Sequence, residues 1–597
     1  MKVAILDFGA QYTKVIDRRV RELRIESDIL PSNTTAKQLK EYSAIILSGG
    51  PNSVYEKDAP KYNKKLFQLG IPILGICYGM QLMNHACGGS VKPTTVKEYG
   101  ETVISTQQSM LFDGLSAQEQ VLMSHGDSVV ELAPGFRTIA TSGTLVAGIE
   151  CPGKKMYGVQ FHPEVDLTTN GKKILQNFLL NICGLQPTFT LHKRVDETIK
   201  QIQQDVGKRT VMVLVSGGVD SAVTATLLLK ALPKEQIVAL HVNHGFLRKN
   251  ESSLVCKALS HLGLNITVIN AEQEFLNALS NIAEPEAKRN IIGDLFMRIV
   301  DREMKNLNLP KDTMLAQGTL RPDLIESASS LVSGKANKIK THHNDSKLVQ
   351  IKRKKGLVIE PNKDLHKDEV REVGRMLGLP KEIVEREPFP GPGLAVRIIC
   401  AEKAETNGIA QIQEQVTNIA TKYGFQSAVL PIRSVGVQGD HRSYGYVVAL
   451  SGNGHFETLK QAAQEIPRVV HQVNRVVYVF ERELNGHMTV IPTGLHKNNI
   501  ELLREADDIV HKKLRKYNVR ASQVPVVLVP VSLRNGYTIA IRPFITNDFM
   551  TGRAARFGKE IPIACLKEIV REVSSIRGID TVAYDLTSKP PATTEWE

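Results

Sequence analysis

Short apolar segments alternate with amphipathic segments along the first two thirds of the chain. In the first part an amphipathic stretch covers residues 12–23, and apolar runs cover 3–8, 43–50, 71–77 and 156–162. Buried strands that alternate with helices form parallel sheets with helices packed on their faces. The pattern therefore predicts an α/β domain over residues 1–186.

The same alternation begins again after residue 190. Apolar runs cover 210–218, 236–245 and 264–271, and a helix is expected from Asp220 onward. A cluster of proline and glycine at 388–393, PFPGPG, interrupts the pattern, as such clusters do between elements. We therefore expect a second α/β domain over residues 187–400.

The remaining residues, 401–597, contain a loose internal repeat. Residues 427–480 and 522–586 each predict the order strand, strand, helix, strand, with Tyr478 and Tyr584 in matching places. One such α+β unit is too small to bury a sheet face, whereas two together can do so. The predicted fold is thus two successive parallel-sheet α/β domains followed by a duplicated small α+β unit, with copies at about 401–486 and 487–597.

Composition narrows the class of protein. The 597 residues include 75 Lys and Arg against 62 Asp and Glu, a net charge of +13, and seven cysteines without a C-x-x-C pair. This cysteine pattern favours a reducing compartment over a disulfide scaffold. No apolar run is long enough for a membrane helix, and the N-terminus lacks signal-peptide features. Aromatic residues do not interleave with the basic run Lys352–Lys355, so we expect no requirement for nucleic acid. From the cysteine pattern we expect a cytosolic protein.

Cys77 lies where an expected strand meets an expected helix, between Gly75 and Gly79. A nucleophile on such a tight turn is exposed at the end of the sheet, and a helix N-terminus stabilises a thiolate. A cysteine nucleophile also needs a base and a group that orients the base. His162 and Glu164, two residues apart on an expected strand, supply both, so the predicted catalytic residues are Cys77, His162 and Glu164.

The segments GICYGMQ (75–81) and GVQFHPE (158–164) resemble those of class I glutamine amidotransferases. The resemblance implies that Cys77 attacks the side-chain amide of glutamine, forms a glutamyl thioester and releases ammonia, with His162 moving the proton and Glu164 holding His162. It also implies that backbone N–H groups of Gly50 and Tyr78 bind the oxyanion. The residues that it implies for glutamine binding are Gln81, Ser124 and Asp127.

A second motif, SGGVDS at 216–221, follows an expected strand and opens a helix. Glycines at this position let the backbone wrap a phosphate, and the absence of Gly-Lys-Ser/Thr excludes a Walker A loop. The motif resembles the pyrophosphate loop of the ATP pyrophosphatases. The resemblance implies Mg²⁺ on Asp220, no organic prosthetic group, and ATP binding by Ser216, Gly217, Gly218, Val219, Asp220 and Ser221.

Four further segments resemble the GMP synthetase family in its longer, eukaryote-like form: GTLRPDLIES (318–327), KTHHN (340–344), PFPGPGL (388–394) and SKPPATTEWE (588–597). The resemblance implies a ligase of purine biosynthesis that adenylylates the C2 oxygen of xanthosine monophosphate (XMP). Ammonia then displaces AMP to give GMP. The implied XMP contacts are Arg248, Asp507, Gln523, Lys589 and Glu595. HKDEVR (366–371) resembles the motif beside the lid of the family, with Lys367, Asp368 and Arg371.

The repeat bears on oligomeric state. Shorter members of the family have one copy of the C-terminal unit and dimerise through it, so here the first copy is expected to imitate a partner subunit. We therefore favour a monomer, with a homodimer as the alternative. Two other functions stay open: an NAD synthetase-like enzyme, whose glutaminase is of a different type, and a catalytically dead nucleotide sensor. A dead sensor should have lost Cys77, His162, Asp220 or Lys589, and all four are present.

Overall fold

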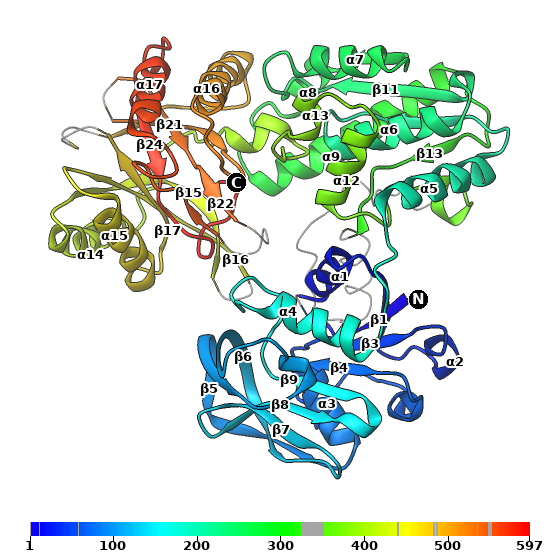
Figure 1. Ribbon diagram of the computed structural model, residues 1–597. Coiled ribbons are helices and arrows are strands. Elements are labelled where there is room, and N and C mark those ends of the chain that lie inside the picture. Colours follow the sequence, from blue (N-terminus) through cyan, green and yellow to red (C-terminus); the bar gives the residue numbers. More distant parts are fainter. Residues whose placement is uncertain are drawn as a thin grey trace. The chain divides into compact units, whose positions relative to one another are not determined.

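The computed structural model (Figure 1) describes the chain except residues 1, 11, 58, 322, 324–351, 439–440, 481–483, 485–487, 534 and 547–551, and describes only the backbone of 94–99, 437–438 and 441–442. All of the segment 340–344 and half of the segment 318–327, both of which resemble the synthetase family, lie outside the described residues. The chain divides into two compact units. The first comprises 1–200, 319–341 and 362–373, and the second comprises 201–318, 342–361 and 374–597.

The first unit contains a nine-stranded sheet in the order β2-β1-β3-β4-β9-β8-β7-β5-β6. The pairs among β2, β1, β3, β4 and β9 are parallel, and those from β9 to β6 are antiparallel. The strands are β1 (Lys2–Asp7), β2 (Glu26–Pro31), β3 (Ala44–Leu47), β4 (Ile73–Ile76), β5 (Ser90–Thr106), β6 (Gln118–Glu131), β7 (Arg137–Ser142), β8 (Leu145–Cys151) and β9 (Met156–Val159).

Helices cover both faces of this sheet, as its apolar strands predict. Val3 and Ile5 of β1 pack in one core with Ile16 of α1, whereas the alternate residues Ala4 and Leu6 pack in another with Met80 of α3. Successive side chains of a strand point to opposite faces, so β1 must be buried on both sides. The helices are α1 (Thr13–Glu22), α2 (Ala36–Leu39), α3 (Tyr78–Ala86), α4 (Gly171–Gln176) and α5 (Leu191–Val206), the last of which continues into the second unit.

The second unit begins with a five-stranded parallel sheet in the order β12-β11-β10-β13-β14. The chain moves outward from β10 in both directions, so the carboxyl end of β10 is a topological switch point, where α/β sheets bind ligands. The elements are β10 (Val211–Leu214), β11 (Ile237–Asn243), β12 (Ile266–Asn270), β13 (Met314–Ala316), β14 (Val358–Ile359), α6 (Val219–Ala231), α7 (Glu251–His261), α8 (Glu272–Ala278), α9 (Pro285–Asn306), α12 (Lys367–Met376, shared with the first unit) and α13 (Lys381–Val384).

The same unit also contains a six-stranded mixed sheet in the order β15-β16-β17-β24-β21-β19. Its two halves meet where β17 and β24 pair antiparallel, with Tyr478 directly opposite Tyr584. The elements are α14 (Ile409–Lys422), β15 (Gln426–Gln438), β16 (His441–Ser451), α15 (Phe456–Val469), β17 (Val473–Val479), α16 (Lys497–Lys516), β19 (Val526–Val529), β21 (Tyr537–Ile541), α17 (Ile563–Ser574) and β24 (Ile579–Asp585). Short pairs are formed by β18 (Thr489–Val490) with β20 (Val531–Ser532) and by β22 (Phe544–Ile545) with β23 (Arg553–Ala554).

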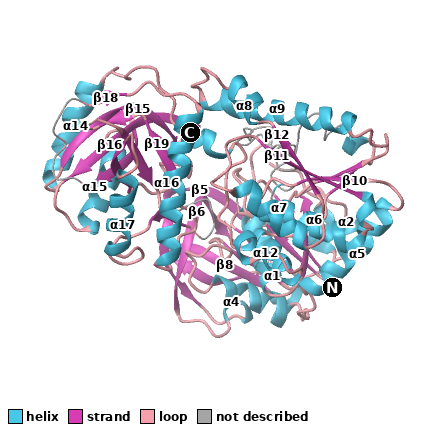
Figure 2. Cartoon of the chain, turned by 90° about the horizontal axis from the view of Figure 1, so that it is seen from above, coloured by secondary structure: helices cyan, strands magenta, loops and turns pink. Residues whose placement is uncertain are grey.

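The order strand, strand, helix, strand occurs in both halves, and the halves also share an irregularity. In the first, Tyr446 faces Val473 and the register then shifts; in the second, Tyr537 faces Ile579 and the register shifts at the same step. β-Bulges are positional features of a fold, so this match aligns the two halves residue by residue. We refer to them as the first repeat (β15, β16, α15, β17) and the second repeat (β19, β21, α17, β24). Their strands form one continuous sheet, in which Figure 2 labels β15, β16 and β19.

The six-stranded sheet is covered differently on its two faces. Apolar residues of α14, α15, α16 and α17 pack against one face, which includes Val448 and Ile539. On the other face Trp596, from the end of the chain, packs with Val447 and Ala540. The C-terminal tail, residues 588–597, thus belongs to the core of this sheet. Among the described helices, none has the length and apolar character that crossing a bilayer needs.

The carboxylate of Asp585, at the end of β24, is the polar centre of this face. Arg475 donates to it at 2.9 Å, Arg542 forms an ion pair with it at 2.9 Å, and all three side chains are fully buried. Burial by itself would raise the pKa of Asp585, but the two arginines outweigh burial and hold its pKa below its usual range. The positive charges of Arg475 and Arg542 are therefore balanced by a buried negative charge only while Asp585 is ionised.

Replacing Asp585 by Asn should destabilise the second unit strongly, because two buried guanidinium groups lose their counter-charge. We expect a loss of about 3–5 kcal/mol in the free energy of unfolding. Urea unfolding followed by the fluorescence of Trp596, the single tryptophan of the chain, measures it. Glu568→Gln, which removes a partner of Lys513 and Lys516 near the surface, is the control and should change stability little. Equal stability of the two variants would contradict the expectation.

Candidate active sites

Cys77 occupies the turn between β4 and α3 that the sequence predicts. Its φ of +52° lies in the left-handed region, which is uncommon for a residue with a side chain. The turn brings α3 so close to β3 that a Cβ on Gly79 would lie 2.5 Å from the carbonyl oxygen of Leu47. The turn thus needs glycine at 79 and holds Cys77 in a strained conformation at the end of the sheet, typical of a nucleophile elbow.

His162 and Glu164 form a buried pair beside this turn. The Nδ1 atom of His162 lies 2.8 Å from Oε1 of Glu164, and Tyr12 places its ring edge-on at 5.2 Å from the imidazole. The expectation that the pair lies on a strand is wrong, since β9 ends at Val159. Beyond Val159 the backbone leaves the ladder with β8, and the N–H of His162 donates instead to the carbonyl oxygen of Leu122 in β6 at 3.1 Å, so the two residues lie in a loop. The loop still brings their side chains together.

The electrostatics of this pair favour a charged imidazole. Burial would lower the pKa of His162, but Glu164 and Cys77 outweigh it and raise the pKa to about 10. At neutral pH the imidazole therefore carries a proton that it can give to a leaving group. The Sγ atom of Cys77 also lies 3.5 Å from Nε2 of Gln160, a neighbour that the sequence analysis did not single out although it lies within the GVQFHPE segment.

The residues expected to bind glutamine lie around the same turn. The side-chain amide of Gln81 donates to the backbone carbonyl oxygen of Asp127 at 2.9 Å and to the side-chain oxygen of Gln160 at 3.1 Å. The Asp127 carboxylate accepts a hydrogen bond from Tyr55 at 3.0 Å. Ser124 places its carbonyl oxygen 3.8 Å from Sγ of Cys77 and exposes its side chain. For the expected oxyanion donors, a Cβ on Gly50 would lie 3.3 Å from the ring of Tyr78, so the two residues adjoin.

The SGGVDS segment forms the turn between β10 and α6, at the switch point of the parallel sheet. Gly217 has a φ of +91°, and Gly218 is the N-cap of α6, so both glycines shape the turn. The hydroxyl groups of Ser216 and Ser221 lie 3.1 Å apart. Arg386 donates to the carbonyl oxygen of Gly217 at 2.7 Å. A turn of this form presents N–H groups at the start of a helix, which is an anion-binding arrangement.

Arg386 connects this turn to a cluster around Phe389, in the PFPGPG segment. The guanidinium groups of Arg248 and Arg397 lie 4.6 and 4.9 Å from the centre of the Phe389 ring. Arg248 contacts Asp507 at 3.3 Å, and Arg397 binds the carboxylate of Glu595 through two hydrogen bonds of 2.9 and 3.0 Å. The fold thus gathers Arg248, Asp507 and Glu595, three of the expected XMP contacts that are far apart in sequence.

The other two expected XMP contacts are tied to the cluster less directly. Gln523 pairs with Phe544 through its backbone, and its neighbour Val524 donates to Glu387 at 3.0 Å. Glu387 lies 3.4 Å from His511, one helical turn beyond Asp507. Lys589 pairs with Gly552 through its backbone. Arg386, Glu387 and Arg397 lie in or beside the proline-rich segment, but nothing in their local pattern predicts their partners.

The residues of the expected lid segment lie in the first unit, at the start of α12. Asp368 lies 3.6 Å from Arg18 of α1. His366, which precedes Lys367, contacts the buried carboxylate of Asp17 at 2.7 Å. Arg371 lies on the second turn of α12. The segment therefore contacts the helix that follows β1.

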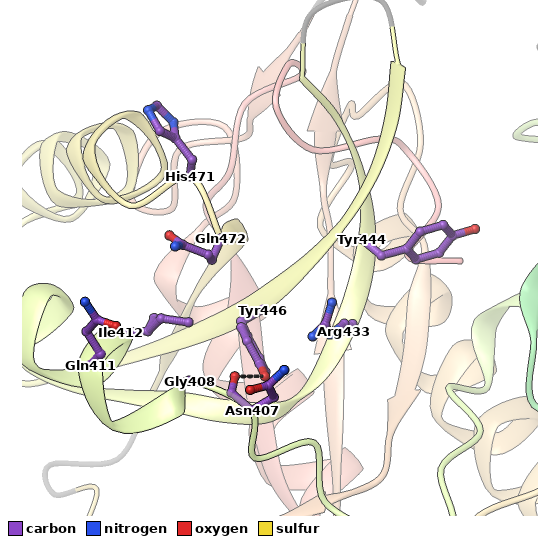
Figure 3. Close-up of a pocket in the computed structure, with 9 residues that line it drawn as sticks. All are labelled: Asn407, Gly408, Gln411, Ile412, Arg433, Tyr444, Tyr446, His471 and Gln472. Atoms are coloured by element: carbon purple, nitrogen blue, oxygen red, sulfur yellow. Dashed lines mark hydrogen bonds between the residues drawn. The ribbon is translucent and has the colours of Figure 1, made fainter.

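An open cavity of about 430 Å³ lies between the first repeat and the start of α14, where Figure 3 shows Tyr446 beside Asn407 and Gly408. The hydroxyl of Tyr446 donates to the carbonyl oxygen of Asn407 at 2.7 Å, closing one side. None of the expected site residues lines this cavity, so it is distinct from both candidate sites.

The two sites define a class: an amidotransferase joined to an ATP-dependent synthetase. Family models support both parts, because "Glutamine amidotransferase class-I" matches residues 4–182, "PP-loop domain" 191–306 and "GMP synthase C terminal domain" 509–596. The chain belongs to the glutamine-hydrolysing GMP synthase family.

Relatives support this assignment along the whole chain. The glutamine-hydrolysing GMP synthase of Dictyostelium discoideum is 46% identical, covering 100% of this chain and 94% of its own. The probable GMP synthase of Caenorhabditis elegans is 44% identical, with 100% and 92% covered. The enzyme of Lactobacillus acidophilus is 42% identical but matches only 80% of this chain, although 96% of its own length is covered. These matches confirm the resemblance to the GMP synthetase family and the α/β fold class that the sequence predicts.

Replacing Glu164 by Gln should lower the pKa of His162, because the negative charge that favours the imidazolium is lost. We expect a fall of about 1–3 pH units from its value near 10. ¹³C NMR of histidine-labelled protein follows the titration, with His162→Asn identifying the signal. An unchanged titration would contradict the proposed pairing.

The raised pKa of His162 also makes the stability of the fold depend on pH. The pKa of His162 is raised from 6.5 to about 10 in the folded protein, so the charged pair stabilises the fold fully below pH 6.5 and loses this effect as the pH rises toward 10. Glu164→Gln should remove most of this dependence.

Proposed function

We propose that this chain makes GMP from XMP, ATP and glutamine, with glutamate, AMP and pyrophosphate as the other products, through the residues of the two sites described above. The observation that supports the proposal best is the strained Cys77 turn with the buried His162–Glu164 pair, in a chain whose family is GMP synthase. Family membership also favours this reaction over the NAD synthetase-like alternative.

In the glutaminase reaction the Cys77 thiolate attacks the side-chain carbonyl carbon of glutamine. The backbone N–H groups of Gly50 and Tyr78 bind the oxygen that becomes negative. His162 gives its proton to the departing nitrogen, so ammonia is released and a glutamyl thioester remains on Cys77. His162, held by Glu164, then takes a proton from water, which attacks the thioester and releases glutamate. Gln81, Ser124 and Asp127 hold the glutamine.

In the synthetase reaction the C2 oxygen of XMP attacks the α-phosphorus of ATP, and pyrophosphate leaves. The turn 216–221 binds the pyrophosphate through its N–H and hydroxyl groups, with Arg386 fixing the carbonyl of Gly217. Ammonia then attacks C2 and AMP departs with the oxygen. Arg248 and Lys589 suit the phosphate of XMP, and Asp507, Gln523 and Glu595 suit its polar groups.

The donor set at the pyrophosphate turn fits Mg²⁺. This ion is commonly bound by one or two carboxylates together with substrate phosphates, rather than by a cage of side chains. Asp220, in the first turn of α6, supplies the carboxylate, and the described residues contain no cluster of three or more ligating side chains, here or elsewhere. When bound, the ion neutralises charge on the pyrophosphate; Asp220 orients it.

We further propose that the protein acts as a monomer in the cytosol. The antiparallel pairing of β17 with β24 joins the two repeats in one sheet and supports a role of the first repeat in place of a partner subunit. All seven cysteines are free, which suits a reducing compartment. The Lys367, Asp368 and Arg371 segment is proposed to act as part of a lid.

Replacing Cys77 by Ala should abolish glutamine-dependent GMP formation by about a thousandfold or more, because the nucleophile is lost. High ammonium should still support synthesis, since the synthetase site has its own residues. Coupled assays with the two nitrogen sources measure this, and Cys183→Ala, a half-buried cysteine of the same unit, is the control. Loss of the ammonium-dependent reaction in a folded variant would sink the division into two sites.

Replacing Asp220 by Asn should remove pyrophosphate release with either nitrogen source, because the orienting carboxylate is lost. The expected fall is about a hundredfold or more. Glutamine hydrolysis should continue at a basal level. Asp294→Asn, an exposed residue of α9, is the matched control. Unchanged pyrophosphate release would show that Asp220 does not act in this reaction.

A further inference from the structure

Arg475, in β17 of the first repeat, is fully buried. The proposed mechanism gives it no contact with XMP, ATP or glutamine. One side of its guanidinium faces Asp585 at 2.9 Å. The other side faces the C-terminal tail, where Nη2 donates to the carbonyl oxygen of Thr593 at 2.9 Å, to its hydroxyl at 3.0 Å and to the carbonyl oxygen of Glu595. A single side chain therefore joins the first repeat to three acceptors of the tail.

Other contacts from the first repeat hold the same stretch. The backbone N–H of Val435, in β15, donates to the carbonyl oxygen of Trp596 at 2.8 Å, and Gly436 pairs with Ala592. The indole of Trp596 donates to Asp585 at 3.0 Å and stacks under Arg475, whose guanidinium lies 5.1 Å from the ring centre. In Figure 1 the C-terminus is seen beside β15, in agreement with these contacts.

We propose that Arg475 is a positioning residue of the synthetase: the first repeat holds the C-terminal tail so that Glu595 meets Arg397 beside Asp507. The proposal rests on the proposed role of Glu595. The carbonyl oxygen that Arg475 binds belongs to Glu595 itself, whose carboxylate binds Arg397 through two hydrogen bonds. Fixing this backbone fixes where the carboxylate points.

The two repeats differ at this position. The shared register shift pairs Arg475 with Val447 in the first repeat and Thr581 with Thr538 in the second. Thr581 donates instead to its neighbour Asp580. A threonine side chain cannot span from the sheet to three acceptors on a tail, whereas a guanidinium has five donors in a fixed fork. The first repeat has therefore a tail-binding group that the second lacks.

The test compares Arg475→Lys with Arg542→Lys in the full chain. Both variants keep a positive charge near Asp585 and disturb the same buried centre, but Arg542 donates to Thr587 rather than to residues 593–596. Acrylamide quenching of Trp596, the single tryptophan, reports the position of the tail without any assumption about the reaction. The ammonium-dependent rate at varied XMP reports the site separately from the glutaminase.

We expect Arg475→Lys to increase the quenching of Trp596 severalfold and to raise KM for XMP about tenfold, because hydrogen bonds from a charged donor are lost. Arg542→Lys should lose a comparable amount of stability but keep Trp596 shielded and KM close to wild type. Thr593→Val removes one tail acceptor of Arg475 and also the hydroxyl that bonds Val435 of the first repeat and Glu595 of the tail, and it should shift both readouts in the same direction.

Equal quenching and equal KM in the two lysine variants would overturn the proposal, as would unchanged values in Thr593→Val. If Arg475→Lys does not fold, Arg475→Gln, which keeps N–H donors, is compared with Arg542→Gln by the same two readouts, and equal values again overturn the proposal. Failure of the proposed function gives a different result: wild type makes no GMP from XMP and ammonium, while the quenching comparison still shows whether Arg475 holds the tail.

Discussion

A buried carboxylate in the six-stranded sheet connects the parts on which the synthetase depends. Asp585 receives hydrogen bonds from Arg475 of the first repeat and from Trp596 of the tail, and it forms an ion pair with Arg542, which follows β21 of the second repeat. Charged groups without water need such compensation, so none of the three partners can move without cost. The tail that this centre holds contains Glu595, whose carboxylate binds Arg397 beside Asp507 of α16.

A second constraint acts in the first unit, at the backbone of Cys77. The strained turn depends on glycine at 79, because only there can α3 approach β3 so closely. The strain places the thiol at the sheet end, and the loop beyond β9 brings His162 to it already charged. A larger side chain at position 79 would therefore prevent the turn that holds Cys77 beside His162.

Local sequence predicted well what lies within a few residues of a motif. The parallel sheets, the turn at Cys77 and the turn at 216–221 all follow from apolar runs that end in glycine. The strand expected at His162 ends earlier, at Val159, because the backbone beyond it turns from β8 toward β6, where His162 binds Leu122. The partners of Arg386, Arg397 and Arg475 could not be predicted, since each side chain binds a residue more than 100 positions away along the chain. Periodicity along the chain contains no information on such contacts.

The most direct test of the account is an isotope experiment with purified protein, XMP, ATP and glutamine labelled with ¹⁵N at the side-chain amide. The account predicts GMP that contains one ¹⁵N atom at its amino group, with AMP and pyrophosphate formed in equal amounts, as mass spectrometry and phosphorus NMR would show. Unlabelled XMP recovered intact, without pyrophosphate release, would contradict it and favour a nucleotide sensor without catalysis.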